Sequence, residues 1–311
     1  MVKLIFLGLL SGFFFSSTFI LNELMSLEGG HWVWSASLRY AYMILFLSIL
    51  ILATQGTRAL SNLAHIFLNH WKFWIVTGCV GFGAFYALIC FSADYTPGWV
   101  IAATWQVTII ASLIILMIFG RTFPKKVWLF SSIIFIGVLL INISHVDEFE
   151  YKDLILGGLP VLVAAFCYPL GNQLVWEAQN NHVSLPNINS PLLKNPFNRV
   201  WLLSIGSLPL WLILIAIYTP PAPNSGQLIN TGLIALLSGV VATSIFLYAR
   251  NKAKQSSEIA GVDATQSSEV VFAMIGSLLL LDSTLPDLVS LIGLGLVFCG
   301  LVLFVKFSSV R

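Results

Sequence analysis

The segment WVIAATWQVTIIASLIILMIFG, residues 99–120, decides the fold class because it contains no charged side chain along its whole length. A helix that crosses the hydrocarbon core of a bilayer needs about 20 mostly apolar residues. Lipid offers no partner for backbone N–H and C=O groups, so a spanning segment must satisfy them within its own helix. Residues 99–120 therefore predict a transmembrane helix.

Nine similar apolar segments lie on either side of this one. The expected spans are residues 4–22, 32–53, 73–92, 99–120, 127–144, 154–176, 200–218, 228–249, 264–281 and 288–305. Eight of the ten contain no Asp, Glu, Lys or Arg, and the exceptions are the second, with Arg39, and the ninth, with Glu269. The sequence thus predicts an all-α polytopic membrane protein with ten transmembrane helices.

Composition supports a membrane protein and argues against other classes. The chain of 311 residues is 58% hydrophobic and only 9% charged, whereas about 25% of the residues in a soluble domain are charged. A net charge of +2 is too small to indicate a nucleic-acid partner. Because the nucleotide-binding, zinc-protease and serine-hydrolase motifs are absent, we expect no enzymatic activity, no cofactor and no metal site.

The distribution of basic residues predicts the orientation. If the N-terminus is placed inside and the spans alternate, thirteen of the fifteen Lys and Arg residues lie in inside segments. Only Lys152 lies outside, and Arg39 lies within a span. Positive charge is concentrated on the cytoplasmic side of membrane proteins. We therefore expect both termini in the cytoplasm.

The two halves of the chain resemble each other. Matching positions occur in the same order in both halves, at separations of 150 to 163 residues. They include Gly8-Leu9 with Gly158-Leu159, Leu21-Asn22 with Gly171-Asn172, Leu38-Arg39 with Asn198-Arg199, Gly78 with Gly239, and Thr122-Phe123-Pro124 with Thr284-Leu285-Pro286. Since each half has an odd number of spans, we predict two inverted five-helix repeats, residues 1–144 and 154–307. Such repeats enclose a site near the membrane midplane.

Two ionisable residues within the spans are the main candidates for function, because charge in lipid is costly. Glu269 could couple proton or cation movement, or it could be a structural carboxyl group hydrogen-bonded to a nearby Ser or Gln. Its repeat partner is Gln106, and we expect the two to share a central cavity. Arg39 could bind an anionic substrate group, pair with Glu269, hold helices together, or extend towards a membrane interface.

Polar and aromatic side chains in other spans are further candidates. Asn22 and Asn172 are matched amides, which should face the bundle interior as cavity lining or as links between helices. Tyr86, Trp105 and Tyr168 lie deep in their spans, and aromatic walls with one acid would suit an organic cation. The alternative is that each of these rings faces lipid or packs in the core. Glu23, near the outer end of the first span, could lie at a channel mouth or be solvated.

One loop is expected to have structure of its own. Residues 57–72 place Leu60, Leu63, Phe67 and Trp71 at helical spacing. The pattern predicts an amphipathic helix on the inner membrane surface, with a plain linker as the alternative.

The chain resembles the drug/metabolite transporter superfamily, in particular its EamA-type ten-helix members and the multidrug resistance efflux transporters among them. The residues that carry the resemblance are Leu21-Asn22, Gly29 to Tyr40, Tyr168 to Gln173, and Thr265 to Ala273. The resemblance implies a pathway lined by the first, third, fourth, sixth, eighth and ninth helices. It favours as lining residues Asn22, Tyr86, Trp105, Gln106, Asn172, Gln173, Gln266 and Glu269.

These observations predict a secondary transporter in the inner membrane of a bacterium. We expect it to export small organic metabolites or drugs by alternating access, with membrane lipids and a small-molecule substrate as partners and with proton coupling through Glu269. The alternative is a non-transporting membrane protein, for example a lipid-handling or assembly factor, in which Glu269 and Arg39 form a structural pair.

Overall fold

The computed structural model describes residues 2–122, 125–144, 151–180, 183–252, 262, 265–281, 283 and 285–308. In these ranges every regular element is a helix and no strand occurs. The first part of the chain forms α1 (Val2–Leu27), α2 (Trp32–Gln55), α3 (Thr57–Asn69), α4 (Trp71–Gly78), η1 (Cys79–Ala84), α5 (Phe85–Ser92), α6 (Gly98–Trp105), α7 (Thr108–Ile118) and α8 (Lys125–Ser144). The second part forms α9 (Tyr151–Gln179), η2 (Pro191–Lys194), α10 (Pro196–Tyr218), α11 (Ser225–Ile234), η3 (Ala235–Ala242), α12 (Thr243–Lys252), η4 (Thr265–Ser267), α14 (Ser268–Leu280) and α15 (Leu288–Ser308).

Eight helical stretches in the described ranges are long and apolar enough to cross a membrane. They correspond to the first eight predicted spans, so the all-helical membrane class is confirmed. The last two predicted spans correspond to shorter apolar helices, Thr265–Leu280 and Leu288–Leu303. Residue 264, where the ninth span was expected to begin, and the repeat anchors Phe123, Pro124 and Thr284 lie outside the described residues.

Two of the spanning stretches contain a π-helical turn. Trp71–Ser92 is formed by α4, η1 and α5, and Ser225–Arg250 by α11, η3 and most of α12. In both, the π-helical segment lies in the middle of the stretch. Local π-helical turns inside α-helices are frequent at functional sites.

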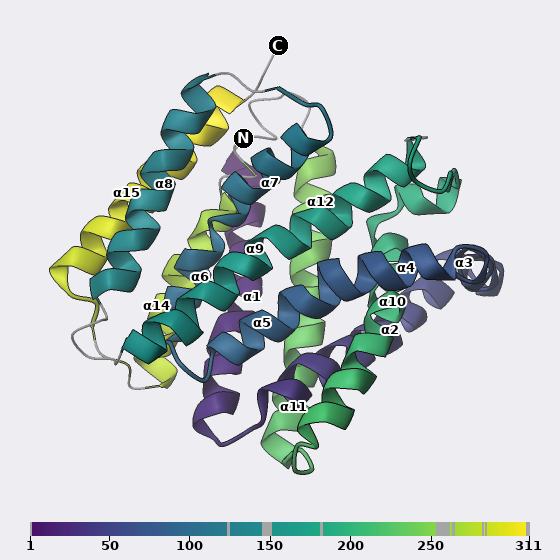
Figure 1. The fold of residues 1–311 in the computed structure, drawn as a ribbon, viewed down its shortest axis with the longest axis horizontal. Coiled ribbons are helices and arrows are strands. Elements are labelled where there is room, and N and C mark those ends of the chain that lie inside the picture. Colours follow the sequence, from purple (N-terminus) through teal and green to yellow (C-terminus); the bar gives the residue numbers. More distant parts are fainter. Residues whose placement is uncertain are drawn as a thin grey trace.

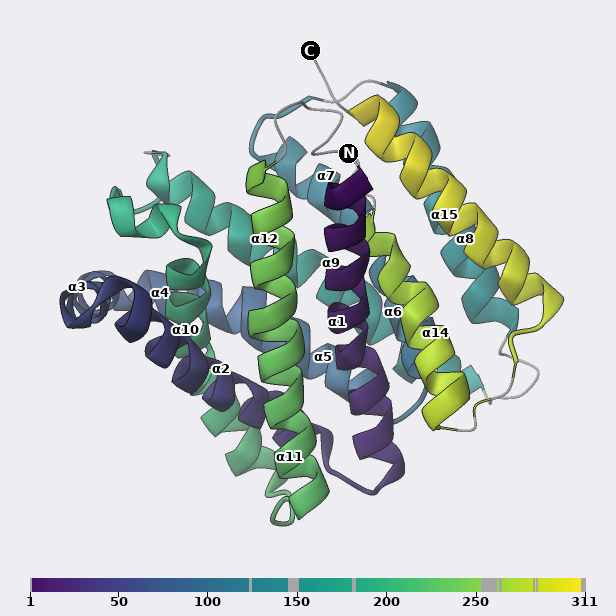
Figure 2. The same ribbon diagram turned by 180° about the vertical axis from the view of Figure 1, so that it is seen from behind.

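The helices pack closely where glycine removes the side chain. The helices α8 and α15 run along each other at one flank (Figures 1 and 2). A Cβ atom at Gly137 of α8 would lie 2.6 Å from the carbonyl oxygen of Gly293 in α15. A similar approach joins α1 to η4 and α14, where Gly8 faces Thr265 and Gly12 faces Ser268. Small residues allow this close backbone contact between helices in lipid.

The loop after α2 forms the predicted amphipathic helix, not a plain linker. It is α3, which lies at the edge of the molecule (Figure 1). Leu63 is fully buried on its inner face. Trp71, predicted to continue this face, begins α4 instead and is 49% exposed.

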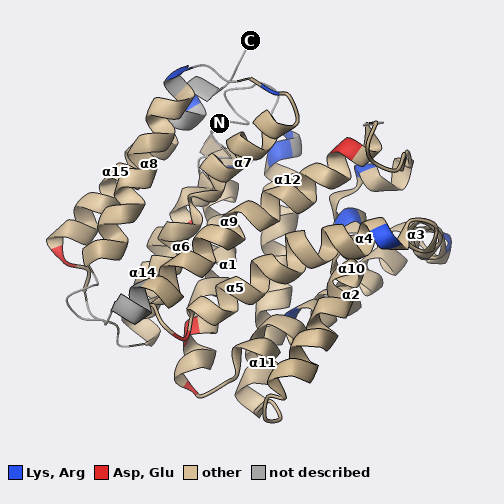
Figure 3. Cartoon of the chain, in the orientation of Figure 1, with Lys and Arg blue, Asp and Glu red and all other residues tan. Residues whose placement is uncertain are grey.

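Charged residues are separated between the two ends of the molecule. The start of α1 and the end of α15 lie on the same side (Figure 1). Among the residues that the structure describes, most Lys and Arg lie toward that side and toward α3, whereas most Asp and Glu lie at the opposite end (Figure 3). Between the two ends the described helices are almost free of charge.

Candidate functional site

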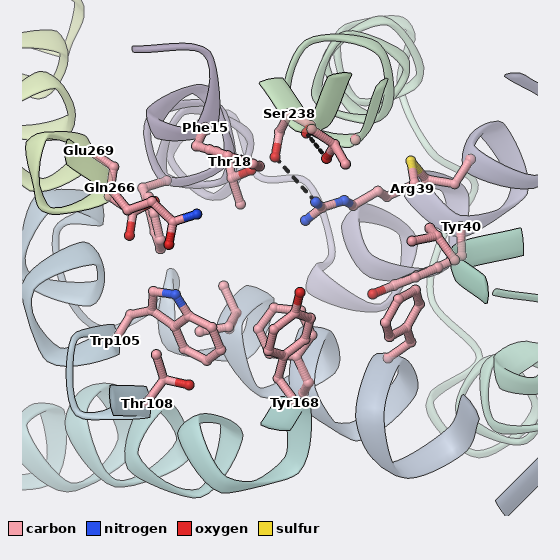
Figure 4. Close-up of a pocket in the computed structure, with 18 residues that line it drawn as sticks. Phe15, Thr18, Arg39, Tyr40, Trp105, Thr108, Tyr168, Ser238, Gln266 and Glu269 are labelled. Carbon is pink, nitrogen blue, oxygen red and sulfur yellow. Dashed lines mark hydrogen bonds between the residues drawn. The ribbon is translucent and has the colours of Figure 1, made fainter. Parts of the chain in front are cut away.

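A cavity of about 250 Å³ lies among the helices. It is lined by residues from the first four and the sixth to ninth predicted spans. Three of the lining residues are π-helical: Phe82 of η1, and Ser238 and Gly239 of η3. Figure 4 shows polar groups entering from opposite sides, with Glu269 and Gln266 facing Arg39 across the space. The cavity therefore combines an acidic side and a basic side.

The acidic side is built where two helices are interrupted. Glu269 lies in the first turn of α14, directly after the 3-10 turn η4, and only 9% of it is exposed. Gln106 lies in the break between α6 and α7. Its Nε2 donates hydrogen bonds to Oε1 of Glu269 at 2.9 Å and to the carbonyl oxygen of Ala102 at 3.1 Å. Gln106 and Glu269 are thus in contact, as expected from the repeat. Only Glu269 lines the cavity, however, because Gln106 is buried beside it, so the expectation that Gln106 is a lining residue is wrong.

The second oxygen of the Glu269 carboxyl group has no partner among the described side chains. No described residue donates a hydrogen bond to Oε2. Glu269 itself lines the cavity. The carboxyl group is therefore held by a neutral amide on one oxygen, while the other remains available to a proton or to a ligand.

The basic side is the guanidinium group of Arg39. Its Nη2 donates to Oγ of Ser238 at 3.4 Å, and its central carbon lies 4.0 Å from the ring centroid of Tyr86. Its Nη1 is buried and has no hydrogen-bond partner in the described part of the chain. No salt bridge joins Arg39 to Glu269, so the structural pair considered from the sequence is not formed.

Three aromatic rings form one wall between the two charged groups. The centroids of Phe85 and Trp105 are 4.9 Å apart, those of Phe85 and Tyr168 are 5.1 Å apart, and those of Trp105 and Tyr168 are 5.8 Å apart. The three residues come from different spanning stretches. Such a cluster offers ring faces and edges to an apolar or aromatic ligand.

Two predicted lining residues lie behind the cavity instead of on its surface. Asn22 is buried, and its Nδ2 donates to the hydroxyl oxygen of Tyr86 at 2.9 Å. Tyr86 is fully buried and supports Arg39 through its ring. Neither lines the cavity. The guanidinium group of Arg39 lies over the ring of Tyr86, and Asn22 is bonded to the hydroxyl group of Tyr86.

Two other predicted lining residues, Asn172 and Gln173, do not line the cavity. Asn172 is exposed, and its Nδ2 donates to the carbonyl oxygen of Tyr168 at 2.9 Å. Gln173 donates to Oε1 of Glu177 at 2.8 Å on the same helix. Their helix α9 reaches the cavity through Tyr168 alone. The expectation that Asn172 faces the interior as Asn22 does is therefore wrong.

Several lining residues were missed by sequence reasoning. Thr18, Phe85, Thr108, Ser238 and Thr243 all line the cavity. Uncharged residues of these types are common in transmembrane helices, so they carry little signal alone. The position of Ser238 next to Gly239, which matches Gly78 in the other half, was the one available indication. In the described ranges no three His, Cys, Asp or Glu residues lie close enough to hold a metal ion.

The described helices and the cavity that they enclose define a polytopic α-helical membrane protein. Within that class the chain belongs to the EmrE family, described as "Putative multidrug resistance efflux transporter", whose model matches residues 2–310. This family lies in the drug/metabolite transporter superfamily, so the resemblance noted in the sequence is confirmed.

Two relatives cover most of the chain. One, "Uncharacterized protein YjlA" of Bacillus subtilis (strain 168), is 36% identical over 329 aligned residues, which cover all of this chain and 96% of the relative. The other, from Shouchella clausii, is named "Uncharacterized 42.1 kDa protein in intracellular alkaline protease 3'region". It is 34% identical over 284 aligned residues, which cover 86% of this chain and 70% of the relative.

Proposed function

We propose that the protein is a secondary transporter that exports a small organic solute in exchange for protons carried by Glu269. The observation that supports this most directly is the carboxyl group of Glu269. It is buried among apolar helices, it lines the cavity, and its hydrogen-bond partner is the neutral side chain of Gln106. An ionisable group in this setting is costly, and function is the usual reason for its presence.

The proposal includes an architecture of ten spans in two inverted repeats, residues 1–144 and 154–307. Equivalent helices make equivalent contacts, which supports it: α1 packs against α14 and η3, while α9 packs against α6, α7 and α5. The third and eighth spans each contain a π-helical turn, and the fourth and ninth are each interrupted beside Gln106 or Glu269. Rocking of one repeat against the other would open the cavity to each side in turn.

The same proposal places both termini in the cytoplasm of a bacterium, at the inner membrane. Its support is the concentration of Lys and Arg on the side of the molecule where the chain begins and ends (Figure 3). Charged segments of this kind stay on the cytoplasmic side during insertion.

Reconstitution into liposomes tests this function. Liposomes with purified protein and a trapped pH indicator are given ethidium, L-phenylalanine or 3-phenylpropionate, which represent cations, zwitterions and anions. The native protein should move protons in response to at least one of them. Glu269→Gln should lose at least nine-tenths of this flux, because an amide cannot carry the proton.

Glu177→Gln provides a matched control. Glu177 is also a buried carboxyl group that accepts a hydrogen bond from a glutamine, but it lies outside the cavity. Its variant should retain proton flux. If Glu269→Gln transports like the native protein, or if it only lowers the thermal unfolding midpoint, Glu269 is structural and the non-transporting alternative gains support.

A further inference from the structure

The cavity holds two opposite charges that the protein does not pair with each other. We propose that the transported solute is a small zwitterion with an apolar ring. Its anionic group binds Arg39, its ammonium group binds Glu269, and its ring lies against Phe85, Trp105 and Tyr168. This inference rests on the proposed transport function and names the chemical class of its substrate.

Arg39 requires an anionic partner. Its guanidinium group enters the cavity from α2, bonded weakly to Ser238 and resting on the ring of Tyr86. The buried Nη1 has no hydrogen-bond acceptor in the described ranges, and a buried donor without an acceptor is costly. A carboxylate offers the planar, two-oxygen acceptor that a guanidinium group binds best.

Glu269 provides a place for a cationic group. Oε1 is taken by Gln106, and the described residues leave Oε2 free. The other ionisable side chains that line the cavity are Arg39, Tyr40 and Tyr168. The helices α1 and α6, which pack against α14, contribute only uncharged side chains to the lining.

Exchange for protons excludes a solute that is only an anion. An antiported solute must displace the proton from Glu269, and an ammonium group does so because it competes for the same carboxylate. A carboxylate would add a second negative charge to the cavity and would favour retention of the proton, so the two would move together. An anion alone would thus travel in the same direction as the proton.

A solute that is only a cation fits the cavity poorly. It would displace the proton, but it would share the cavity with the positive charge of Arg39 and leave that charge without a partner. Like charges repel strongly where water is scarce. A zwitterion satisfies both requirements, since each of its charges meets the opposite charge of the protein.

The size of the cavity limits the body of the solute. Its volume of about 250 Å³ lies just below the range of roughly 300–1,000 Å³ that is typical of ligand sites. The space therefore suits a molecule with a single ring, which the three aromatic side chains can contact on its faces and edges.

Three ligands that share a phenylethyl body test the proposal: L-phenylalanine, 2-phenylethylamine and 3-phenylpropionate. Binding of each radiolabelled ligand to the purified, detergent-solubilised protein is measured by equilibrium dialysis. L-phenylalanine should bind at least about tenfold more tightly than either analogue, as expected for one additional charge-assisted hydrogen bond. Arg39→Gln should remove its advantage over the amine, and Glu269→Gln its advantage over the carboxylate.

Further variants separate charge recognition from folding. Arg39→Lys retains the positive charge and should retain the order of the three affinities. Arg199→Gln and Glu177→Gln change an arginine and a glutamate outside the cavity lining and should leave all three affinities unchanged. In weakly buffered solution the native protein should release protons when it binds L-phenylalanine or 2-phenylethylamine, but not when it binds 3-phenylpropionate.

The proposal is overturned if either single-charge analogue binds as tightly as L-phenylalanine, if none of the three binds, or if Arg39→Gln leaves the affinity ratios unchanged. These outcomes differ from failure of the transport function. If ethidium drives proton flux through Glu269 while L-phenylalanine does not bind, the protein is a transporter and the zwitterion assignment is wrong. If no tested solute moves protons, the transport function itself fails.

Discussion

At the scale of the residue, Glu23 joins three helices through its carboxylate. Its Oε2 accepts hydrogen bonds from the backbone nitrogen of Gly98 at 2.9 Å and from Oγ of Ser277 at 2.6 Å. Oγ of Ser283 donates to Oε1 at 3.4 Å. Since Gly98 begins α6, the carboxylate also faces the positive end of a helix. Glu23 therefore links α1, α6 and α14, and it is neither solvated nor at an open mouth.

The variant Glu23→Gln should lower stability. It replaces charge-assisted hydrogen bonds, each worth about 1.5–3 kcal/mol, with weaker neutral ones, so we expect a loss of about 1–3 kcal/mol. Thermal unfolding in detergent measures the change. Glu28→Gln, at an exposed position just after the end of α1, is the control and should unfold with the native midpoint. Equal midpoints for all three proteins would argue against the link.

Asp94, in the loop between α5 and α6, predicts a pH effect. Partial burial raises its pKa, while the hydrogen bond that Ser26 donates at 2.7 Å and the nearby His31 counteract the rise. Because the pKa of Asp94 is higher in the folded protein, its carboxyl group stabilises the fold when it is protonated. This stabilisation is fully present below the unfolded pKa of about 3.9 and is lost as pH rises through the folded pKa.

Ser26→Ala removes a hydrogen bond to the charged form of Asp94 and should therefore enlarge this loss of stability. Unfolding midpoints measured between about pH 4 and pH 7 should fall more steeply for Ser26→Ala than for the native protein, and Asp94→Asn should remove the slope.

At the scale of the element, glycine determines how closely α4 and α10 approach. A Cβ atom at Gly206 would overlap the carbonyl oxygen of Trp74, and one at Gly78 would lie 2.6 Å from the backbone of Gly206. Backbone atoms cannot move aside as a flexible side chain can. The crossing of α4 and α10 therefore depends on these two positions, and it positions η1 and its residue Phe82 beside the cavity.

Gly206→Ala should separate α4 from α10 and destabilise the protein by about 1–3 kcal/mol, the usual cost of overpacking. Gly295→Ala in α15 is the matched control, because a Cβ atom there meets no atom within 4 Å. Alanine favours a helix over glycine by up to about 1 kcal/mol, so the control should be as stable as the native protein or slightly more so. Opposite shifts of the two unfolding midpoints are expected, and a shared shift would contradict the close crossing.

At the scale of the whole molecule, the segregation of charge predicts a single orientation in the membrane. Residue 61 is on α3, which lies toward the end of the molecule where most described Lys and Arg residues lie. Residue 222 is in the loop between α10 and α11, at the opposite end of the molecule (Figures 1 and 3). Both are exposed. The natural cysteines are free, and Cys299 is exposed, so all four are replaced by serine before new ones are introduced.

In intact cells a membrane-impermeant maleimide should label Ala222→Cys but not Ser61→Cys. Permeabilisation should then make Ser61→Cys reactive, because its side faces the cytoplasm in the orientation that the basic residues favour. Labelling of Ser61→Cys in intact cells would reverse the proposed orientation.

The sequence by itself determined the helical membrane class and most of the spans. Its long uncharged segments leave few alternatives, because the backbone in lipid must bond to itself. The match between Gln106 and Glu269, made from the repeat alone, also led to a hydrogen bond that the structure contains. These predictions depend on local composition and on linear order, which a sequence displays directly.

Only the tertiary structure decided which polar side chains meet. Asn22 and Asn172 occupy matched positions, yet Asn22 is buried and bonded to Tyr86, whereas Asn172 is exposed on α9. The sequence also did not show that Arg39 and Glu269 form no ion pair, or that Ser238 lines the cavity and accepts a hydrogen bond from Arg39. The physical reason is that almost every face of a helix in an apolar bundle is hydrophobic, so periodicity does not reveal rotation about its axis. That rotation depends on close contacts between particular helices, such as the glycine crossings, and these contacts exist only in three dimensions.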